Sequence, residues 1–362
     1  DDFETNKSQM TDTFQSVMSL FDSIEGLTNF LAGRLIELAE SVPEHDAIKS
    51  YFKDDPMDDI SIYDYEKYPA SLYRPPGDKA PNREAFGKFG SWLNSYSRKK
   101  YGRPLALACS ADLAGSTNIA GFSKGWKGSE DFGMYHRERN PKGTLLPQGI
   151  TEFANAGLMC GISSVNFSPN PYSKFSGFIT ACSTYGSFSY LKYGAYRLYS
   201  QIAQDSQLKI GKTIWVAGHS GPETAEDFRT HFGIFAPGVT QLFPEGHILN
   251  LHPWEYNEVP VMLAAALKTN IPIIALHLTR PPIEIPDRKA LGMSSHFESS
   301  RGAYLIKDYD NDHQKEGMIL VRGTSVISEL CKYLPNIISD GPNVKIIAAL
   351  SWGLFKIQDE EY

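Results

Sequence analysis

The sequence predicts an α/β protein built on a doubly wound, mostly parallel sheet with helices on both faces. From Asn82 onward, apolar runs typical of buried strands alternate with segments whose apolar residues recur at helical spacing. A helical segment precedes this pattern, and prolines and basic residues between 280 and 290 separate it from a second, shorter α/β pattern. We therefore expect a helical linker or extension at 1–80, the main domain at 81–285, and an incomplete second domain at 286–362.

The amino-terminal part is predicted to contain two helices followed by a long loop. Apolar residues between Met10 and Val42 recur at helical spacing, with a break near Gly26. The stretch 53–81 is rich in Asp, Tyr and Pro and is expected to be a loop. Its acidic run at 54–59 is more typical of a solvated turn than of a metal site.

The main and second domains are predicted element by element from the same alternation. In the main domain we expect strands at 104–110, 178–183, 213–217, 247–251 and 271–278, and helices at 83–98, 152–164, 189–204 and 255–268. In the second domain we expect strands near 304–306, 317–321 and 344–350, and a helix at 325–334. A parallel domain that ends on its second strand cannot cover both faces of its sheet, so we infer a piece of a longer polypeptide.

Composition is that of an ordinary soluble globular protein, with 41% hydrophobic and 21% charged residues. The net charge of −7 argues against nucleic acid or an anionic membrane surface as a partner, since both require a basic patch. No membrane span or signal peptide is predicted. The four cysteines form no C-x-x-C pair and lie in apolar contexts, which predicts buried free thiols and a cytoplasmic location.

Glu152 is the first candidate catalytic residue. It opens the segment 152–164, which is rich in small and apolar residues and is predicted to be a buried helix. A buried carboxylate is costly and usually has a raised pKa or a dedicated partner, and such groups are frequent at active sites. The alternative interpretation is a carboxylate that caps the amino-terminal end of the helix.

Four polar corners follow predicted strands, at 110–118, 184–188, 218–231 and 279–280. Ligands of open α/β sheets bind at such corners. The run from Gly218 to Pro222 is similar to the nucleophile elbow of hydrolases, but Pro222 stands where that motif requires glycine. The histidines lack metal-ligand spacing and no glycine-rich phosphate loop occurs, so we predict no protein metal site. A phosphorylated ligand would need isolated Arg, His and Ser side chains.

Taken in order, these corners resemble the pyrimidine-binding domain of transketolase, a thiamine diphosphate enzyme. The similar segments, with the family pattern in parentheses, are Ser110-Ala111-Asp112-Leu113 with Ser116 (S-A-D-L-x-x-S-N), Gly149-Ile150-Thr151-Glu152 (G-V-R-E-H-A-M), Thr184-Tyr185-Gly186-Ser187-Phe188 (T-F-x-x-F), Tyr193-Gly194-Ala195-Tyr196-Arg197-Leu198 (A-G-A-x-R-L), Gly218-His219-Ser220 through Glu226-Asp227-Phe228-Arg229-Thr230-His231 (T-H-D-S…G-E-D-G-P-T-H), Asn257-Glu258-Val259 (G-N-E-V) and 352–359 (W-E-L-F-x-x-Q). The resemblance covers the chain from about residue 80 to its end. It implies a pyrimidine-binding domain at 81–285 and the start of a transketolase-like C-terminal domain at 286–362.

The resemblance implies a role for each cofactor-binding candidate. Glu152 would bond the ring nitrogen of the aminopyrimidine of thiamine diphosphate and favour its imino form. Tyr185 and Phe188 would stack on the pyrimidine or wall its pocket. Asp112 would lie near the cofactor or at the subunit interface. The cofactor would supply the electron sink, and the protein its orientation.

The resemblance also implies a sugar-phosphate substrate. The substrate-binding candidates are Ser116, His219, Arg280, Arg83, Asp227 and His231. The first three match phosphate contacts of the family, and Arg83 is a further candidate for the same task. His231 would bond the reacting carbonyl or hydroxyl, and Asp227 the C2 hydroxyl. With Glu152, the two histidines form the predicted catalytic set.

The family binds the diphosphate through Mg²⁺ on a G-D-G…N motif in a separate domain, and no Gly-Asp-Gly occurs in this sequence. The resemblance therefore implies a diphosphate-binding domain or subunit as partner, and a homodimer-type assembly through the pyrimidine-binding domain. Thr151 and Phe153 stand where the family has Arg and His. They leave two alternatives open: another thiamine diphosphate enzyme acting on a 2-oxo acid, and a non-catalytic transketolase-like subunit.

Overall fold

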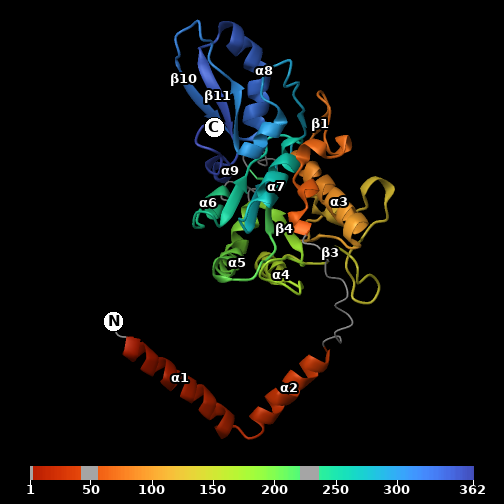
Figure 1. The fold of residues 1–362 in the computed structure, drawn as a ribbon, viewed down its shortest axis with the longest axis vertical. Coiled ribbons are helices and arrows are strands. Elements are labelled where there is room, and N and C mark those ends of the chain that lie inside the picture. The colour runs from red at the N-terminus through yellow and green to blue at the C-terminus, as the bar shows by residue number, and fades with distance from the viewer. Residues whose placement is uncertain (1–2, 42–55, 221–235) are drawn as a thin grey trace. The chain divides into compact units, whose positions relative to one another are not determined.

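The computed structural model describes residues 3–41, 56–220 and 236–362, and the chain forms two compact units, 1–50 and 51–362 (Figure 1). The first unit contains α1 (Phe3–Ser23) and α2 (Leu27–Ser41). Gly26 separates them with a positive φ of 81°, a conformation that suits glycine. The predicted pair of helices with a break near Gly26 is therefore confirmed.

The second unit is built on a six-stranded sheet with the strand order β3-β2-β4-β5-β7-β6, in which every neighbouring pair is parallel. Its strands are β2 (Ala106–Ser110), β3 (Leu145–Leu146), β4 (Ile179–Tyr185), β5 (Thr213–Gly218), β6 (Ile248–Leu251) and β7 (Ile273–His277). Its helices are α3 (Asn82–Tyr101), α4 (Glu152–Ser164), α5 (Tyr193–Asp205), α6 (Ala236–Thr240) and α7 (Glu258–Lys268).

The predicted fold class is confirmed. The two-residue β3 and the short α6 were not predicted, and a 3₁₀ helix at Gly186–Lys192 occupies the start of the helix expected at 189.

Two hydrophobic cores show that helices cover both faces of this sheet. Residues of α3 and α7, such as Phe89 and Leu263, pack in one core together with Ile214 and Val216 of β5. Residues of α4 and α5 pack in the other core, where Trp215 of the same strand is fully buried. Consecutive residues of β5 thus pack in opposite cores, as expected of a strand that is buried on both faces.

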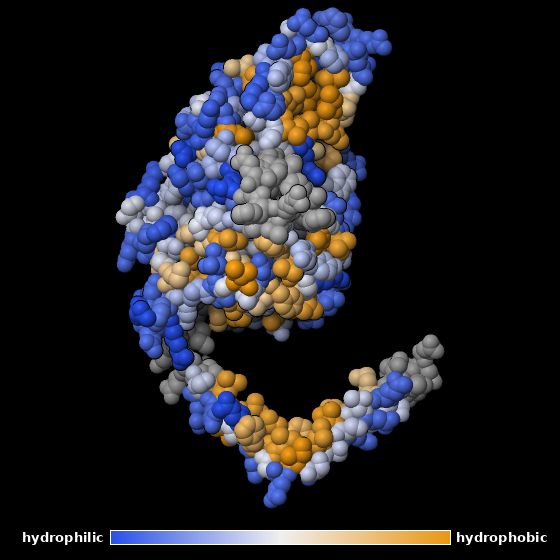
Figure 2. Space-filling model, turned by 180° about the vertical axis from the view of Figure 1, so that it is seen from behind, coloured by the Kyte–Doolittle hydropathy of each residue, from blue (hydrophilic) through white to orange (hydrophobic). Residues whose placement is uncertain are grey.

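The carboxyl-terminal part of this unit carries a small mixed sheet. Strand β10 (Gly317–Val321) runs parallel to β11 (Val344–Ala349), which pairs antiparallel with β9 (Ala303–Lys307). Helices α8 (Thr324–Asp340) and α9 (Trp352–Lys356) accompany it, and a short antiparallel pair joins β1 (Lys79–Ala80) to β8 (Ile283–Glu284). Apolar side chains gather on the surface of the small sheet (Figure 2), among them the exposed Met318 and Leu320 of β10.

The prediction of a solvated turn in the acidic run is wrong at Asp59. Its side chain is buried and accepts hydrogen bonds from Tyr96 at 2.8 Å, Tyr101 at 2.9 Å and Lys100 at 2.8 Å. Burial alone would raise the pKa of Asp59, but these hydrogen bonds lower it below its usual value. Asp59 therefore fastens the loop to the end of α3, a contact between residues about forty positions apart that local composition does not predict.

The four cysteines are free thiols, as predicted, but burial is complete for only three of them. Cys109, Cys160 and Cys182 are buried, whereas Cys331 on α8 is half-buried. Among the described residues, no helix has the length and apolar character that crossing a membrane requires.

Candidate functional site

The carboxyl ends of four parallel strands bring the predicted site residues to one edge of the sheet. Tyr185 ends β4, while Ser116 lies in the turn that follows β2. His219 comes directly after β5, and Arg280 follows β7 by three residues. Because these strands are parallel and adjacent, residues that are up to 164 positions apart in the sequence share this edge.

Four residues, Arg83, Ser116, Tyr185 and His219, are linked by direct contacts and form what we call the Arg83 cluster. From the first turn of α3, Arg83 Nη1 donates to the Ser116 carbonyl at 2.7 Å and lies 2.5 Å from His219 Nε2. The Tyr185 ring stacks on the His219 imidazole, with centroids 4.2 Å apart and planes inclined by 20°. The Tyr185 hydroxyl donates to Ser116 Oγ at 3.2 Å. The structure thus brings together four residues that the sequence predicted separately.

The contact between Arg83 and His219 assigns a role to one ring nitrogen of the histidine. A guanidinium can only donate hydrogen bonds, so His219 Nε2 is the acceptor in this contact. His219 is also held in a left-handed backbone conformation, with φ of 53°, and Asp112 takes φ of 56° in the turn after β2. Such strained positions in non-glycine residues concentrate at functional sites.

Glu152 is the first residue of α4, as predicted, and its side chain is only 6% exposed. The buried hydroxyl of Thr184 on β4 donates to Glu152 Oε1 at 3.0 Å. Thr151 occupies the N-cap position and makes no capping bond with its side chain. The carboxylate of Glu152 therefore has a dedicated partner on the sheet, and the alternative interpretation as a helix cap is not supported.

Glu152 Oε2 is the unused oxygen of this carboxylate, since it accepts no hydrogen bond from the part of the chain that the structure describes. Thr184, which holds Oε1, is a site residue that sequence reasoning missed. Thr184 could have been identified from its position as the first residue of the polar corner 184–188, directly before Tyr185.

Lys192 is a second residue that the sequence did not single out. It is fully buried, and its Nζ donates to the carbonyls of Cys182 at 2.9 Å and Val216 at 3.0 Å. Burial lowers its pKa, while nearby groups that include Cys182 and Glu152 oppose this shift. The two carbonyls belong to β4 and β5, so Lys192 links the strand that carries Thr184 to the strand that leads to His219.

The remaining predicted site residues are Phe188, Asp112, Arg280, Asp227 and His231. Phe188 is half-buried in the 3₁₀ helix after β4, whereas Asp112 and Arg280 are exposed. The backbone N–H of Thr279, beside Arg280, donates to Asn82 Oδ1 at 2.8 Å, which ties the corner after β7 to the start of α3. Two further candidates, Asp227 and His231, lie outside the described residues, so their positions stay predictions.

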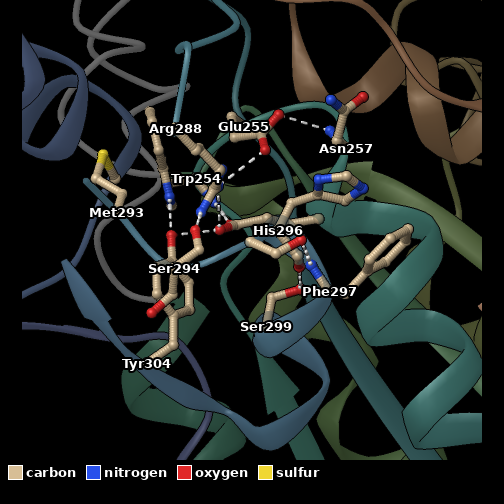
Figure 3. Close-up of polar contacts among 12 residues, drawn as sticks. Trp254, Glu255, Asn257, Arg288, Met293, Ser294, His296, Phe297, Ser299 and Tyr304 are labelled. Atoms are coloured by element: carbon tan, nitrogen blue, oxygen red, sulfur yellow. Dashed lines mark hydrogen bonds and ion pairs between the residues drawn. The ribbon is translucent and has the colours of Figure 1, made fainter. Parts of the chain in front are cut away.

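A buried polar network lies around Arg288 and Glu255 (Figure 3). It includes Glu258, the first residue of α7. Arg288 Nη2 donates to Glu255 Oε1 and to Glu258 Oε1, both at 2.9 Å. Glu258 also accepts from the Tyr304 hydroxyl at 2.6 Å and from the Trp254 backbone N–H at 3.0 Å. Burial raises the pKa of Glu258 to about 7; Arg288 opposes this shift and Glu255 adds to it. The network joins the loop after β6 to the segment that leads into β9.

Within the described ranges, no group of three or more His, Cys, Asp or Glu side chains could hold a metal ion. The site comprises a buried carboxylate with an unused oxygen (Glu152), an aromatic wall (Tyr185 and Phe188) and the Arg83 cluster. This set can hold a ring nitrogen at Glu152 and an anionic group near Arg83.

Comparison with known proteins relates the chain to one family by its sequence. A family model described as "Transketolase, pyrimidine binding domain" matches residues 100–282. The chloroplastic transketolase of Spinacia oleracea is 27% identical over 260 residues, covering 72% of this chain and 30% of that protein. Transketolase 2 of Escherichia coli is 25% identical over 259 residues, covering 72% and 34%. The chain thus spans about a third of the length of these curated relatives.

The fold comparison gives a similar result over most of the chain. The crystal structure of a transketolase from Campylobacter jejuni superposes with a TM-score of 0.60 at 18% identity, covering 92% of this chain and 44% of that one. At this identity the likeness is one of fold.

Proposed function

Because the chain belongs to the transketolase pyrimidine-binding domain family, we propose that it forms the pyrimidine-binding part of a transketolase. It would transfer a two-carbon ketol unit between sugar phosphates at an interface with a diphosphate-binding domain, supplied by another chain or fragment. The observation that carries this proposal is Glu152, a buried carboxylate with one oxygen held by Thr184 and the other unused.

Glu152 fits the aminopyrimidine of thiamine diphosphate by its chemistry. Thr184 fixes Oε1, so Oε2 is left to bond a ring nitrogen. Tyr185 and Phe188 border the same corner and would wall the ring. When bound, thiamine diphosphate supplies the electron sink for cleaving the carbon–carbon bond beside a carbonyl. The task of Glu152 is to hold a proton at the ring nitrogen, away from water.

The Arg83 cluster fits the phosphate end of a sugar phosphate. Arg83 is a permanent cation whose planar guanidinium suits a phosphate group, and His219 lies in contact with it. Charge-assisted bonds from Arg83 and Arg280, with Ser116 as a neutral donor, would orient the substrate. In this proposal, Asp227 contacts the C2 hydroxyl, and His231 the reacting carbonyl or hydroxyl. Asp112 would lie near the cofactor or at the subunit interface.

The partner and the metal follow from the resemblance and belong to the proposal. Mg²⁺ and the diphosphate would be bound mainly by the diphosphate-binding domain, since this sequence has no Gly-Asp-Gly. A homodimer-type assembly through the sheet-bearing domain would complete each site.

Ketol transfer in a reconstituted complex tests the proposal. The full chain, co-expressed with a transketolase diphosphate-binding domain from the same organism, should convert xylulose 5-phosphate and ribose 5-phosphate when thiamine diphosphate and Mg²⁺ are present. Glu152→Gln should reduce kcat by at least about 100-fold, the usual contribution of a positioned proton-transfer group. The matched control Glu138→Gln changes an exposed carboxylate that is not among the site residues and should leave kcat unchanged.

The outcomes separate the proposal from its two alternatives. Full activity of Glu152→Gln would refute the role of this residue. Pyruvate consumption with release of carbon dioxide, in place of ketol transfer, would support an enzyme acting on a 2-oxo acid. Absence of thiamine diphosphate binding by the complex in calorimetry would support a non-catalytic subunit.

A further inference from the structure

A cavity of about 470 Å³ lies at the amino-terminal edge of the main sheet, opposite the candidate site. Its lining includes residues that directly precede three strands: Lys212 before β5, His247 before β6 and Pro272 before β7. Its volume is in the range of pockets that bind small molecules. Since strands β5 and β7 lead from this cavity to His219 and Arg280 at the other edge, the two sites lie at opposite ends of the same strands.

Lys212 is the unusual group of this cavity. It is only 8% exposed, and its Nζ donates to the backbone carbonyls of Thr269 and Ile271, the latter at 2.8 Å. Among the described residues, no carboxylate forms an ion pair with it. Burial lowers the pKa of Lys212 to about 8. A buried ammonium is normally paired with an anion, and carbonyl groups supply hydrogen bonds but no net negative charge.

The rest of the lining has the same sign of charge and an apolar wall. Lys268 in the last turn of α7 and Lys209 add two ammonium groups, whereas Asp58 is the acidic residue among the lining side chains. His247 Nδ1 lies 3.1 Å from Ser200 Oγ, which also accepts from Arg197 at 2.8 Å. Apolar side chains on the same cavity, such as Met57, Phe175 and Leu267, can contact an organic group.

We propose that this cavity is an anion site that binds a small phosphate ester carrying an apolar or aromatic group. Lys212 and Lys268 hold the phosphate by charge-assisted hydrogen bonds, and the apolar lining contacts the organic part. This site is independent of the proposed ketol transfer, because it shares no residue with the candidate active site.

Isothermal titration calorimetry of the full chain tests this site, with adenosine monophosphate, inorganic phosphate and adenosine as probes. Adenosine monophosphate should bind at least about 10-fold more tightly than adenosine, since the phosphate supplies the charged contacts. Lys212→Met should weaken its binding by about 10-fold or more, and Lys268→Glu should do the same from an exposed position. Arg83→Met tests the competing phosphate site, because it changes a cation at the opposite edge of the sheet.

Binding that is lost in both lysine variants and retained in Arg83→Met supports the proposal. Binding that survives both lysine changes, or that only Arg83→Met removes, would place the phosphate elsewhere and overturn it, as would no binding of adenosine monophosphate at millimolar concentration. Lys268 is exposed, so its variant keeps the test decisive if Lys212→Met does not fold. Circular dichroism of each variant identifies that case.

Discussion

Glu152 and Glu258 are both buried carboxylates at the first residue of a helix, yet their surroundings are opposite. Glu152 has one neutral partner, the hydroxyl of Thr184, and an unused oxygen. Glu258 uses both oxygens, bonding Arg288 and Tyr304 through Oε1 and the backbone of Trp254 through Oε2. A helix start favours an anion in both places, so the number of partners is what distinguishes a carboxylate that can bind a ligand from one that holds the fold together.

The charged neighbours of Glu152 and Glu258 differ in the same way as their hydrogen-bond partners. Glu258 lies with Glu255 against a single buried guanidinium, so the network is complete without a ligand. Glu152 has no cation in hydrogen-bond contact among the described residues, and the buried ammonium of Lys192 donates to carbonyls instead. A ligand nitrogen would therefore complete the surroundings of Glu152, whereas nothing remains to be completed at Glu258.

The largest expected effect on stability is that of Arg288→Met. The change removes the cation and leaves two buried carboxylates uncompensated, which should lower the free energy of unfolding by about 3–5 kcal/mol. Urea denaturation measures this loss. The matched control is Arg301→Met, which breaks a half-exposed ion pair with Glu298 and should cost less than about 1 kcal/mol. Equal losses in the two variants would contradict the assignment of Glu258 to a structural network.

A smaller effect concerns how stability depends on pH at Glu258. Its pKa in the folded state is about 7, above its ordinary value of 4.5, so the folded state binds more protons between these values. The protonated side chain of Glu258 therefore stabilises the folded state below about pH 4.5, and this stabilisation is lost as pH rises to about 7. Since the amide introduced by Glu258→Gln does not ionise, the stability advantage of the native chain over this variant should shrink by roughly 2–3 kcal/mol from pH 5 to pH 8.

The difference in stability between the native chain and Glu258→Gln does not contain the opposing contribution of buried histidines. Burial lowers the pKa of His277 to about 3, so this neutral histidine favours the folded state above about pH 6.5 and loses that effect as pH falls. It is common to both proteins and cancels. A stability difference that stays constant with pH, or that grows as pH rises, would contradict the protonation assigned to Glu258.

The sequence predicted those features that repeat along the chain. A run of small and apolar residues predicted the start of α4 at Glu152, and the alternation of strands and helices predicted β10 at 317–321. The same alternation predicted a parallel sheet whose carboxyl edge gathers Ser116, Tyr185 and His219. These features depend on local spacing and on one topological rule.

The features that the sequence missed depend on side-chain partners that the fold brings together. Thr184 is 32 positions from Glu152, Lys100 is 41 from Asp59, and Arg288 is 30 from Glu258. Which of many buried polar residues faces which partner is set by strand register and helix rotation, and neither is visible in composition or spacing. The same holds for Lys192, whose partners are backbone carbonyls of two strands.

The smallest expected effect is on activity and tests whether Thr184 positions Glu152. Thr184→Val keeps the shape of the side chain but removes the hydroxyl that holds Oε1, so the carboxylate can rotate away from the ring nitrogen. In the reconstituted complex we expect kcat to fall about 10-fold, equivalent to the loss of one net hydrogen bond of about 1.4 kcal/mol. Thr184→Ser, which retains the hydroxyl, should restore most of this loss.

A control separates positioning from simple destabilisation. Thr144 is also fully buried, and its hydroxyl donates to the Phe122 carbonyl at 2.9 Å, so Thr144→Val removes a comparable bond away from Glu152. Both Val variants should lose similar stability, about 1 kcal/mol, but only Thr184→Val should change kcat. If Thr144→Val slowed turnover equally, or if Thr184→Ser failed to rescue it, the hydroxyl would serve the fold alone. The unused oxygen of Glu152 would then need another explanation, because a carboxylate free to rotate would not present a fixed acceptor to a ring nitrogen.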